Sequence, residues 1–318
     1  MEQPRSGRAT KISIIGAGFV GSAFAYCLMI SGLSSEIVLV DVNFKKAEGE
    51  ALDLSHGVPF VRPVVVRAGK MEDIEGSDLV VITAGAAQKP GETRLDLVSR
   101  NAAIFKGLIP EVVKYAPDSI ILVVTNPVDI MTYIALKFSG FPKNRVLGSG
   151  TALDTARFRY LLSKHCNVSA RNVHAYIIGE HGDSEVAVWS LANIAGMRLA
   201  EYCPLCEKAC RPEFREELLD DVRRAAYEVI DRKGATYWAI GLAMTEIVGA
   251  ILRNENVVMT ISCLLDGYYG VDDVCLSVPT LLNRTGVVHP VMIQLNEEEQ
   301  EAFRNSARII KGVLKQLL

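Results

Sequence analysis

The stretch KISIIGAGFVG, residues 11–21, decides the fold. It begins with apolar, β-branched residues and ends in the spacing GxGxxG, with glycines at Gly16, Gly18 and Gly21. Between a strand and a helix, the first glycine permits a tight turn, the second lets the backbone approach a pyrophosphate, and the third lets helix and strand pack closely. The phosphates would then lie at the helix N-terminus, where the macrodipole favours negative charge. The stretch therefore predicts a dinucleotide-binding turn at the start of a parallel sheet.

A carboxylate stands where such a turn requires one. Asp41 ends the next apolar run, EIVLVD, about twenty residues after the glycines. A carboxylate at this position can accept hydrogen bonds from both ribose hydroxyls and repel a 2′-phosphate. Taken alone, Asp41 could be a strand-end turn residue, but strand, glycines and acid together favour NAD over NADP. Lys46, on the following helical segment, is a second candidate contact, although a lysine on a surface helix is more often only solvated.

Further apolar runs extend this pattern through the first half of the chain. They lie at 63–69, 78–85, 119–127 and 145–150, separated by helical stretches. Continuously apolar strands are typical of parallel sheets that are buried on both faces. The sequence thus predicts an α/β fold: a doubly wound (Rossmann) sheet in residues 1–150.

After Gly150 the strict alternation of strand and helix stops. A helical stretch that breaks at Gly234 is followed by an antiparallel meander that turns at the Asp-Gly pair 266–267, and the chain closes with a helix capped by Asn296. Strands and helices without βαβ order indicate an α+β substrate domain over residues 151–318. A binding cleft between the two halves is the default expectation.

Composition excludes several classes of protein. The 318 residues are 49% hydrophobic and carry a net charge of −3, so no basic excess is available for a nucleic acid backbone. The longest aliphatic runs have the length of strands, and a membrane-spanning helix needs about 20 apolar residues. The N-terminus lacks the apolar core of a secretory signal. We expect a soluble, cytoplasmic protein with no nucleic acid or membrane partner.

Seven cysteines do not suggest a disulfide framework in a chain of this size. Cys27, Cys166, Cys263 and Cys275 are typical of reduced core thiols because their neighbours are apolar. The group at 203–210, CPLCEKAC, could hold zinc or an iron–sulfur cluster. A structural zinc site normally has four ligands and no fourth is evident, so we expect no metal.

Three residues of the second half are candidates for a reaction site. His181 lies between glycines and acids in YIIGEHGDSE, residues 176–185. Asp154 and Arg157 are three apart on one helical stretch and share a face, which by itself is most often a surface ion pair. A zinc hydrolase site is disfavoured because the pattern HExxH is absent.

Ordered motifs along the chain decide between these alternatives. AGAAQKPGETRLDL (84–97), TNPVD (125–129), GSGTALDTARFRYL (148–161), IIGEHGDSEVAVWS (177–190), KGATYWAIG (233–241) and SVPTLLNRTG (277–286) resemble, in order, the 2-hydroxy acid dehydrogenase family. The resemblance spans roughly residues 11–315 and is greatest to the bacterial L-lactate branch. It implies an NAD-dependent oxidoreductase that reversibly interconverts pyruvate and lactate.

The same resemblance implies a role for each matching residue. His181 would donate the proton, Asp154 would orient its ring, and Arg94 would polarise the substrate carbonyl from a loop that closes over it. The implied substrate contacts are Gln88, Arg94, Asn126, Asp129, Arg157 and Thr236. The implied cofactor contacts are Gly16, Gly18, Val20, Gly21, Asp41, Lys46, Thr83, Gly85, Ala86, Asn126 and Ser149.

Gln88 bears on the choice between lactate and malate. The malate enzymes carry arginine at this loop position, and burying the second carboxylate of oxaloacetate without a cation is unfavourable. Asp129 in NPVD also resembles the lactate branch, whereas the malate branch tends to NPVN. Malate dehydrogenase, a broader 2-oxo acid reductase and a non-catalytic NAD-binding relic remain alternatives; the complete residue set argues against the relic.

Arg159 and His174 match the pair that binds fructose 1,6-bisphosphate in activated bacterial members of the family. Without the resemblance they would be one surface cation and one strand histidine. Arg159 is two residues beyond Arg157 and so points to a different helix face. Because the family shares these phosphates between subunits, an effector site implies a homotetramer.

Overall fold

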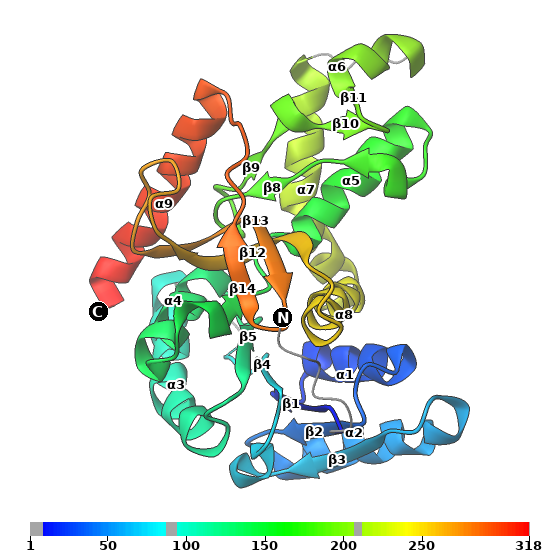
Figure 1. The fold of residues 1–318 in the computed structure, drawn as a ribbon, viewed down its shortest axis with the longest axis vertical. Coiled ribbons are helices and arrows are strands. Elements are labelled where there is room, and N and C mark those ends of the chain that lie inside the picture. Colours follow the sequence, from blue (N-terminus) through cyan, green and yellow to red (C-terminus); the bar gives the residue numbers. More distant parts are fainter. Residues whose placement is uncertain (1–8, 87–93, 207–211, 318) are drawn as a thin grey trace.

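The computed structural model describes residues 9–86, 94–206 and 212–317. A twisted nine-stranded sheet forms its centre (Figure 1). In spatial order the strands are β14 (Gly286–Pro290), β13 (Val274–Asn283), β12 (Val257–Leu265), β6 (Val146–Gly148), β5 (Ile120–Val123), β4 (Leu79–Ile82), β1 (Lys11–Ile15), β2 (Glu36–Val40) and β3 (Val65–Gly69). The six strands of the first half are parallel, which confirms the doubly wound pattern.

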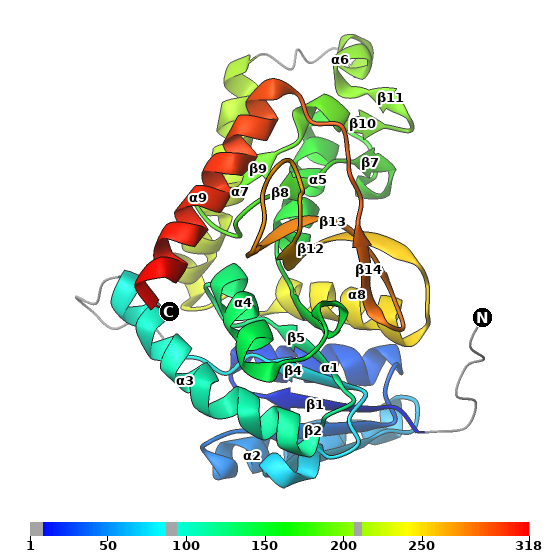
Figure 2. The same cartoon turned by 60° about the vertical axis from the view of Figure 1, so that its left-hand side comes forward.

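Helices cover both faces of this sheet. In two views α1 and α8 lie together on one side, and α3 and α4 on the other (Figures 1 and 2). The helices are α1 (Phe19–Ser31), α2 (Phe44–His56), α3 (Arg94–Tyr115), α4 (Val128–Ser139), α5 (Ala152–Cys166), α6 (Leu199–Tyr202), α7 (Pro212–Lys233), α8 (Trp238–Leu252) and α9 (Glu297–Leu317). Among the described helices, none is long and apolar enough to cross a bilayer.

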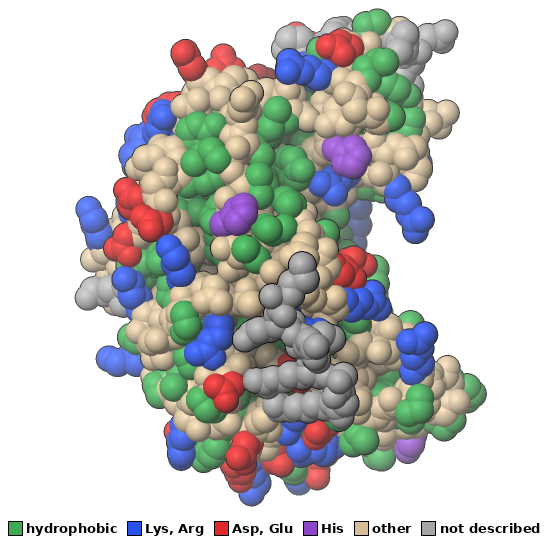
Figure 3. Space-filling view, in the orientation of Figure 1, with side chains coloured by type: hydrophobic (Ala, Val, Ile, Leu, Met, Phe, Trp, Pro, Cys, Tyr) green, Lys and Arg blue, Asp and Glu red, His purple; other side chains and the backbone are tan. Residues whose placement is uncertain are grey.

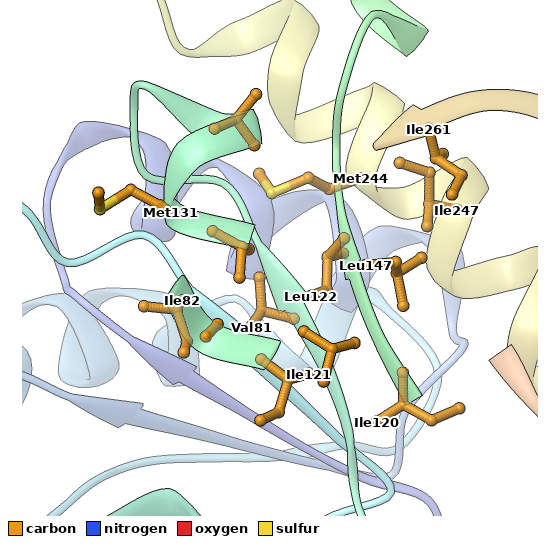
Figure 4. Packing of buried hydrophobic residues seen from close by; sticks show 14 of the residues in the cluster. Val81, Ile82, Ile120, Ile121, Leu122, Met131, Leu147, Met244, Ile247 and Ile261 are labelled. Carbon is orange, nitrogen blue, oxygen red and sulfur yellow. The ribbon is translucent and has the colours of Figure 1, made fainter. Parts of the chain in front are cut away.

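The sheet does not end where the sequence pattern changes. The antiparallel meander β12–β13–β14 adds to the parallel strands because Ser262 of β12 pairs with Gly148 of β6. Figure 4 shows Leu122 of β5 in the same packed cluster as Met244 and Ile247 of α8. The main core therefore includes residues from both halves of the chain, and the division at residue 150 remains a prediction about domains rather than a boundary of the core.

A second, smaller core lies between α5, α7 and the short strands of the second half. It includes Phe158 and Leu162 of α5 and Val222 of α7. Two short sheets flank it: β7 (Val173–His174) with β10 (Asn193–Ile194) and β11 (Met197–Arg198), and β8 (Ile177–Ile178) with β9 (Val186–Ala187). This mixed arrangement confirms the α+β character of the second half. The break at Gly234 is confirmed as well: this glycine has φ 83° and follows the last residue of α7.

The C-terminal helix connects this lobe with the rest of the molecule. α9 runs beside β9 and reaches the helices α3 and α4 (Figure 2). Its N-cap is Asn296, whose Oδ1 accepts from the Glu299 N–H at 2.8 Å, while a Glu299 oxygen accepts from the Asn296 N–H at 3.0 Å. This reciprocal capping box confirms the expected cap.

On the face drawn in Figure 3, positive and negative side chains are interspersed rather than gathered by sign. The right-hand edge of this face is hollowed between the lobe that carries α5 and α7 and the lobe that carries α1 and α2 (Figures 1 and 3).

Candidate active site

The glycine turn lies between β1 and α1, at the carboxyl end of the strand. Gly16 has φ 111°, which favours glycine, and its N–H donates to the Val40 carbonyl at 2.7 Å. A Cβ added at Gly21 would lie 1.9 Å from the Gly16 oxygen, so that position excludes any side chain. A Cβ added at Gly18 would meet no atom within 4 Å. The backbone at Gly18 therefore borders open space, as a pyrophosphate site requires.

Asp41 is built into the same turn. One carboxylate oxygen accepts from the Ala17 N–H at 2.7 Å and the other from the Asn43 N–H at 2.8 Å. A carboxylate oxygen can accept more than one hydrogen bond, so these contacts fix Asp41 and still leave it able to bind ribose hydroxyls. The residues present fit a dinucleotide with an unmodified ribose.

The loops that follow β4 and β5 are connected by Asn101, a buried side chain of α3. Its Oδ1 accepts from the Ala86 N–H at 2.8 Å, and its Nδ2 donates to the Asn126 carbonyl at 2.9 Å. Thr83 donates to the Gly16 carbonyl at 2.8 Å. The carboxyl ends of β1, β4 and β5 thus form one connected edge, where open α/β sheets bind their ligands.

Asp154 is the centre of a hydrogen-bonded cluster that contains an imidazole and a guanidinium. Its Oδ2 lies 2.6 Å from Nδ1 of His181, and its Oδ1 accepts from Nη1 of Arg157 at 2.7 Å. The Asp154 side chain is 3% exposed, whereas His181 is 27% and Arg157 17% exposed. One buried carboxylate therefore holds two partly accessible cationic groups beside each other. Because Nδ1 of His181 faces Asp154, Nε2 is the nitrogen that can exchange a proton with a substrate.

The electrostatics of the cluster favour a protonated imidazole. Burial alone would lower the pKa of His181, but the charge and hydrogen bond of Asp154, with Asp129 and Glu185 behind them, raise that pKa to about 9. Burial opposes ionisation of Asp154 too, yet His181 and Arg157 hold its pKa below the usual value. The ground state is thus an ion pair in which His181 carries a proton at neutral pH.

Asp129 lies beneath His181 rather than in the open part of the site. Its side chain is buried; Oδ2 accepts from the His181 N–H at 2.7 Å and Oδ1 from the Ser262 hydroxyl at 2.6 Å. Burial outweighs these hydrogen bonds and raises the pKa of Asp129 to about 6. Asp129 joins the start of α4 to the loop that carries His181, and its expected contact with substrate remains a prediction.

A cavity of about 1010 Å³ opens elsewhere, among Asp78, Lys114 and Asn144. These residues precede β4, β5 and β6, so the cavity lies at the amino ends of the strands. The glycine turn and Asp41 follow the carboxyl ends instead. Chemistry in this fold belongs to the carboxyl edge, and we do not place the active site in this cavity.

Two family models cover nearly the whole chain. Residues 10–148 match the lactate/malate dehydrogenase NAD binding domain, and residues 151–318 match the lactate/malate dehydrogenase alpha/beta C-terminal domain. The chain belongs to the lactate/malate dehydrogenase family. It is accordingly an NAD-dependent oxidoreductase, and NAD is the coenzyme that the turn at Gly16–Gly21 fits.

Known members of the lactate/malate dehydrogenase family are similar over almost their full length. An L-lactate dehydrogenase of Thermoanaerobacter sp. (strain X514) is 58% identical over 96% of this chain and 99% of its own. L-lactate dehydrogenase 1 of Clostridium acetobutylicum is 59% identical over 96% and 97%. The crystal structure of the minor L-lactate dehydrogenase from Enterococcus mundtii superposes with a TM-score of 0.94 at 43% identity, covering 98% of this chain and 99% of that one.

The structure brings together several residues that the sequence of this lactate/malate dehydrogenase singled out. Asp154, Arg157, His181 and Asp129 form one hydrogen-bonded cluster. Val20 is half-buried in α1, Ser149 is buried after β6, and Thr236 is half-buried in the connection from α7 to α8. A Cβ at Gly85 would lie 2.6 Å from Thr125, so that loop also needs glycine.

Of the other expected residues, Lys46 has no described side-chain contact with the site, and Gln88 and the Arg94 side chain lie outside the described structure. Lys46 is exposed on α2, where its own N–H joins the Asn43 cap, and no described contact connects its side chain to the turn. Arg94 begins α3, but its side chain lies outside the described structure, as does the whole of Gln88. The roles assigned to Arg94, Gln88 and Lys46 therefore remain predictions.

The residues that support the loop around His181 were not among those predicted from the sequence. Ser306 of α9 accepts from the Glu180 N–H at 2.7 Å, and both carboxylate oxygens of Glu299 accept from Ser190, at 2.9 Å from its N–H and 2.6 Å from its hydroxyl. Glu185 is buried, and burial raises its pKa to about 8, with Asp154 adding to the rise. The only sequence signal was the position of Glu185 and Ser190 inside the histidine motif.

Arg159 contacts the residue next to His174, but the two side chains differ in exposure. Arg159 donates from Nε to the Ala175 carbonyl at 3.0 Å, and burial lowers its pKa. His174, the residue before Ala175, is exposed on β7. Arg159 thus contacts the segment that follows His174, whereas Arg157 binds Asp154.

The cysteines require one correction. Cys203 is disulfide-bonded, whereas the sequence suggested no disulfide framework and left the role of the group at 203–210 open. Cys27, Cys166, Cys263 and Cys275 form no disulfide, which confirms the reduced thiols. Within the described ranges no group of His, Cys, Asp and Glu could hold a metal ion, and Cys210 lies outside those ranges.

Proposed function

We propose that this chain is an L-lactate dehydrogenase that reduces pyruvate to (S)-lactate with NADH and catalyses the reverse reaction. The observation that carries the proposal is the position of Asp154, which holds an imidazole and a guanidinium at once, with Asp154–His181 at 2.6 Å and Asp154–Arg157 at 2.7 Å. Such a cluster suits a substrate whose carboxylate is adjacent to a reducible carbonyl. The names of the similar proteins support it.

Each residue then has a defined task. Arg157 donates one hydrogen bond to Asp154 from Nη1. The remaining N–H groups of its planar guanidinium can bind the pyruvate carboxylate with two hydrogen bonds. His181 gives its Nε2 proton to the keto oxygen; NADH, when bound at the glycine turn, would supply the hydride that the keto carbon needs. The resulting neutral imidazole keeps its Nδ1–H toward Asp154, which sets the tautomer. Arg94 would polarise the carbonyl from the first position of α3.

The pH dependence tests the acid–base assignment. Pyruvate reduction needs protonated His181, so kcat/KM for pyruvate should stay level below the pKa of about 9 and fall about tenfold per pH unit above it. Lactate oxidation needs the neutral ring and should show the opposite trend. Asp154→Asn should move the midpoint down, because Asp154 is the main group that raises the pKa. A wild-type midpoint near the ordinary histidine value would contradict the assignment.

We also propose a cytoplasmic homotetramer activated by fructose 1,6-bisphosphate bound at Arg159 and His174. Two observations support this proposal: the resemblance, and the hydrogen bond from Arg159 to the carbonyl of Ala175, the residue after His174. The bisphosphate should raise the rate of pyruvate reduction at neutral pH, and Arg159→Gln should abolish the increase. Lys164→Gln, an exposed cation on the same helix, is the matched control. An equal response in all three proteins, or no response in the wild type, would remove the effector site.

A further inference from the structure

An aromatic cluster joins the glycine turn to the segment that contains Thr236. Phe19, the first residue of α1, stacks on Tyr237 with ring centroids 5.2 Å apart and planes at 20°. The rings of Tyr237 and Trp238 meet edge to face, with centroids 4.7 Å apart and planes at 61°. Lys233 Nζ lies 3.5 Å from the centre of the Tyr237 ring. Four side chains from two distant parts of the sequence thus form one contact.

This cluster is not part of the hydrophobic core. Phe19 is 69% exposed and Trp238 58% exposed, so burial alone does not account for the stacked geometry. Aromatic pairs and a cation over a ring add attraction beyond the apolar area that they cover. The cluster is a surface connection whose loss would leave the core of the fold untouched.

The two helices that adjoin the stack, α1 and α8, pack closely against each other. α1 and α8 approach until a Cβ added at Gly241 would lie 3.2 Å from the Ala23 carbonyl. The Gly241 N–H donates to the Tyr237 carbonyl at 3.2 Å, which ties Tyr237 to the first turn of α8. On the other side Phe19 immediately follows Gly18, whose backbone borders the open space of the turn. A ligand at Gly18 and a ligand at Thr236 would therefore each touch a residue adjacent to the stack.

We propose that the Phe19–Tyr237 stack couples the two ligand sites: a dinucleotide on the glycine turn fixes Phe19, which holds Tyr237 and thereby sets Thr236 against the 2-oxo acid. Phe19 and Tyr237 are positioning residues in this scheme. The proposal rests on the function proposed above, because it takes the turn as the NADH site and Thr236 as part of the substrate pocket.

Coupling is measurable because it is reciprocal. If NADH tightens the binding of a substrate analogue, the analogue tightens the binding of NADH by the same factor. The probe is oxamate, an unreactive analogue with the carboxylate and carbonyl of pyruvate. The coupling factor is the NADH dissociation constant without oxamate divided by that with saturating oxamate, read from NADH fluorescence. Phe19→Ala and Tyr237→Ala should each lower this factor by about 3- to 10-fold.

The double variant and two controls make the test specific. Phe19→Ala with Tyr237→Ala should lower the factor no further than either single change, because both remove the same contact. Phe19→Tyr keeps a ring and should restore the wild-type factor. Tyr26→Ala removes another exposed ring of α1 and should leave the factor unchanged. An unchanged factor in the single variants, or losses that multiply in the double variant, overturns the proposal. Failure of the wild type to bind NADH would instead overturn the proposed function.

Discussion

Replacing His181 by asparagine should lower kcat for pyruvate reduction by about 10²- to 10⁴-fold, the usual contribution of a positioned general acid. Asparagine has an amide in place of the ring and can still hydrogen-bond to Asp154, but it cannot donate a proton at neutral pH. The backbone N–H of residue 181 would still donate to Asp129, so the loop should keep its position. The rate is read from the loss of NADH absorbance at saturating pyruvate.

His289→Asn is the matched control for this change. His289 is an exposed histidine on β14, with Nδ1 3.0 Å from the Pro290 carbonyl. Its replacement should leave kcat unaltered. The dissociation constant of NADH should stay within about twofold in both variants, because neither side chain belongs to the glycine turn. Full activity of His181→Asn would mean that the proton comes from another group.

Replacing Arg157 by lysine should lower kcat/KM for pyruvate by about 10²-fold. Lysine keeps the charge but loses the planar fork that can grip a carboxylate and Asp154 together. Most of the loss should appear in KM, because the bond to the carboxylate forms on binding and persists through the reaction. The measurement is the initial rate over a range of pyruvate concentrations at saturating NADH.

Arg308→Lys provides the comparison for the arginine change. Arg308 is an exposed arginine of α9 paired with Glu301, so its conversion to lysine changes a surface contact only. Its kcat/KM should match that of the wild type. A normal kcat/KM in Arg157→Lys would show that the substrate carboxylate is bound elsewhere.

The parts of this fold that local patterns specify could be predicted from the sequence. Continuous apolar runs identified the parallel strands, and the spacing of Gly16, Gly18 and Gly21 placed the turn. The spacing of three between Asp154 and Arg157 put both on one side of α5, where the structure finds them bonded. These inferences succeed because helix and strand periods fix which neighbours share a face.

Contacts between distant segments could not be predicted in the same way. An apolar strand such as β12 does not reveal which edge it will join, so its pairing with β6 across residue 150 was not foreseen. The NPVD motif identified Asp129 but not its burial beneath His181, 52 positions along the chain. Ser306 and Glu299 of α9 support the loop around His181 from more than a hundred residues away, and no local pattern marks them. Such roles depend on the packing of whole elements.

The central claim is that this cluster reduces a 2-oxo acid with one carboxylate. The most direct measurement compares kcat/KM for pyruvate and for oxaloacetate with NADH as the reductant. Gln88 is neutral, and a second buried carboxylate without a cation costs several kcal/mol, so pyruvate should be preferred by at least about 10²-fold. Faster turnover of oxaloacetate would contradict this account and assign the chain to the malate branch, and no NADH oxidation with either acid would contradict the catalytic cluster itself.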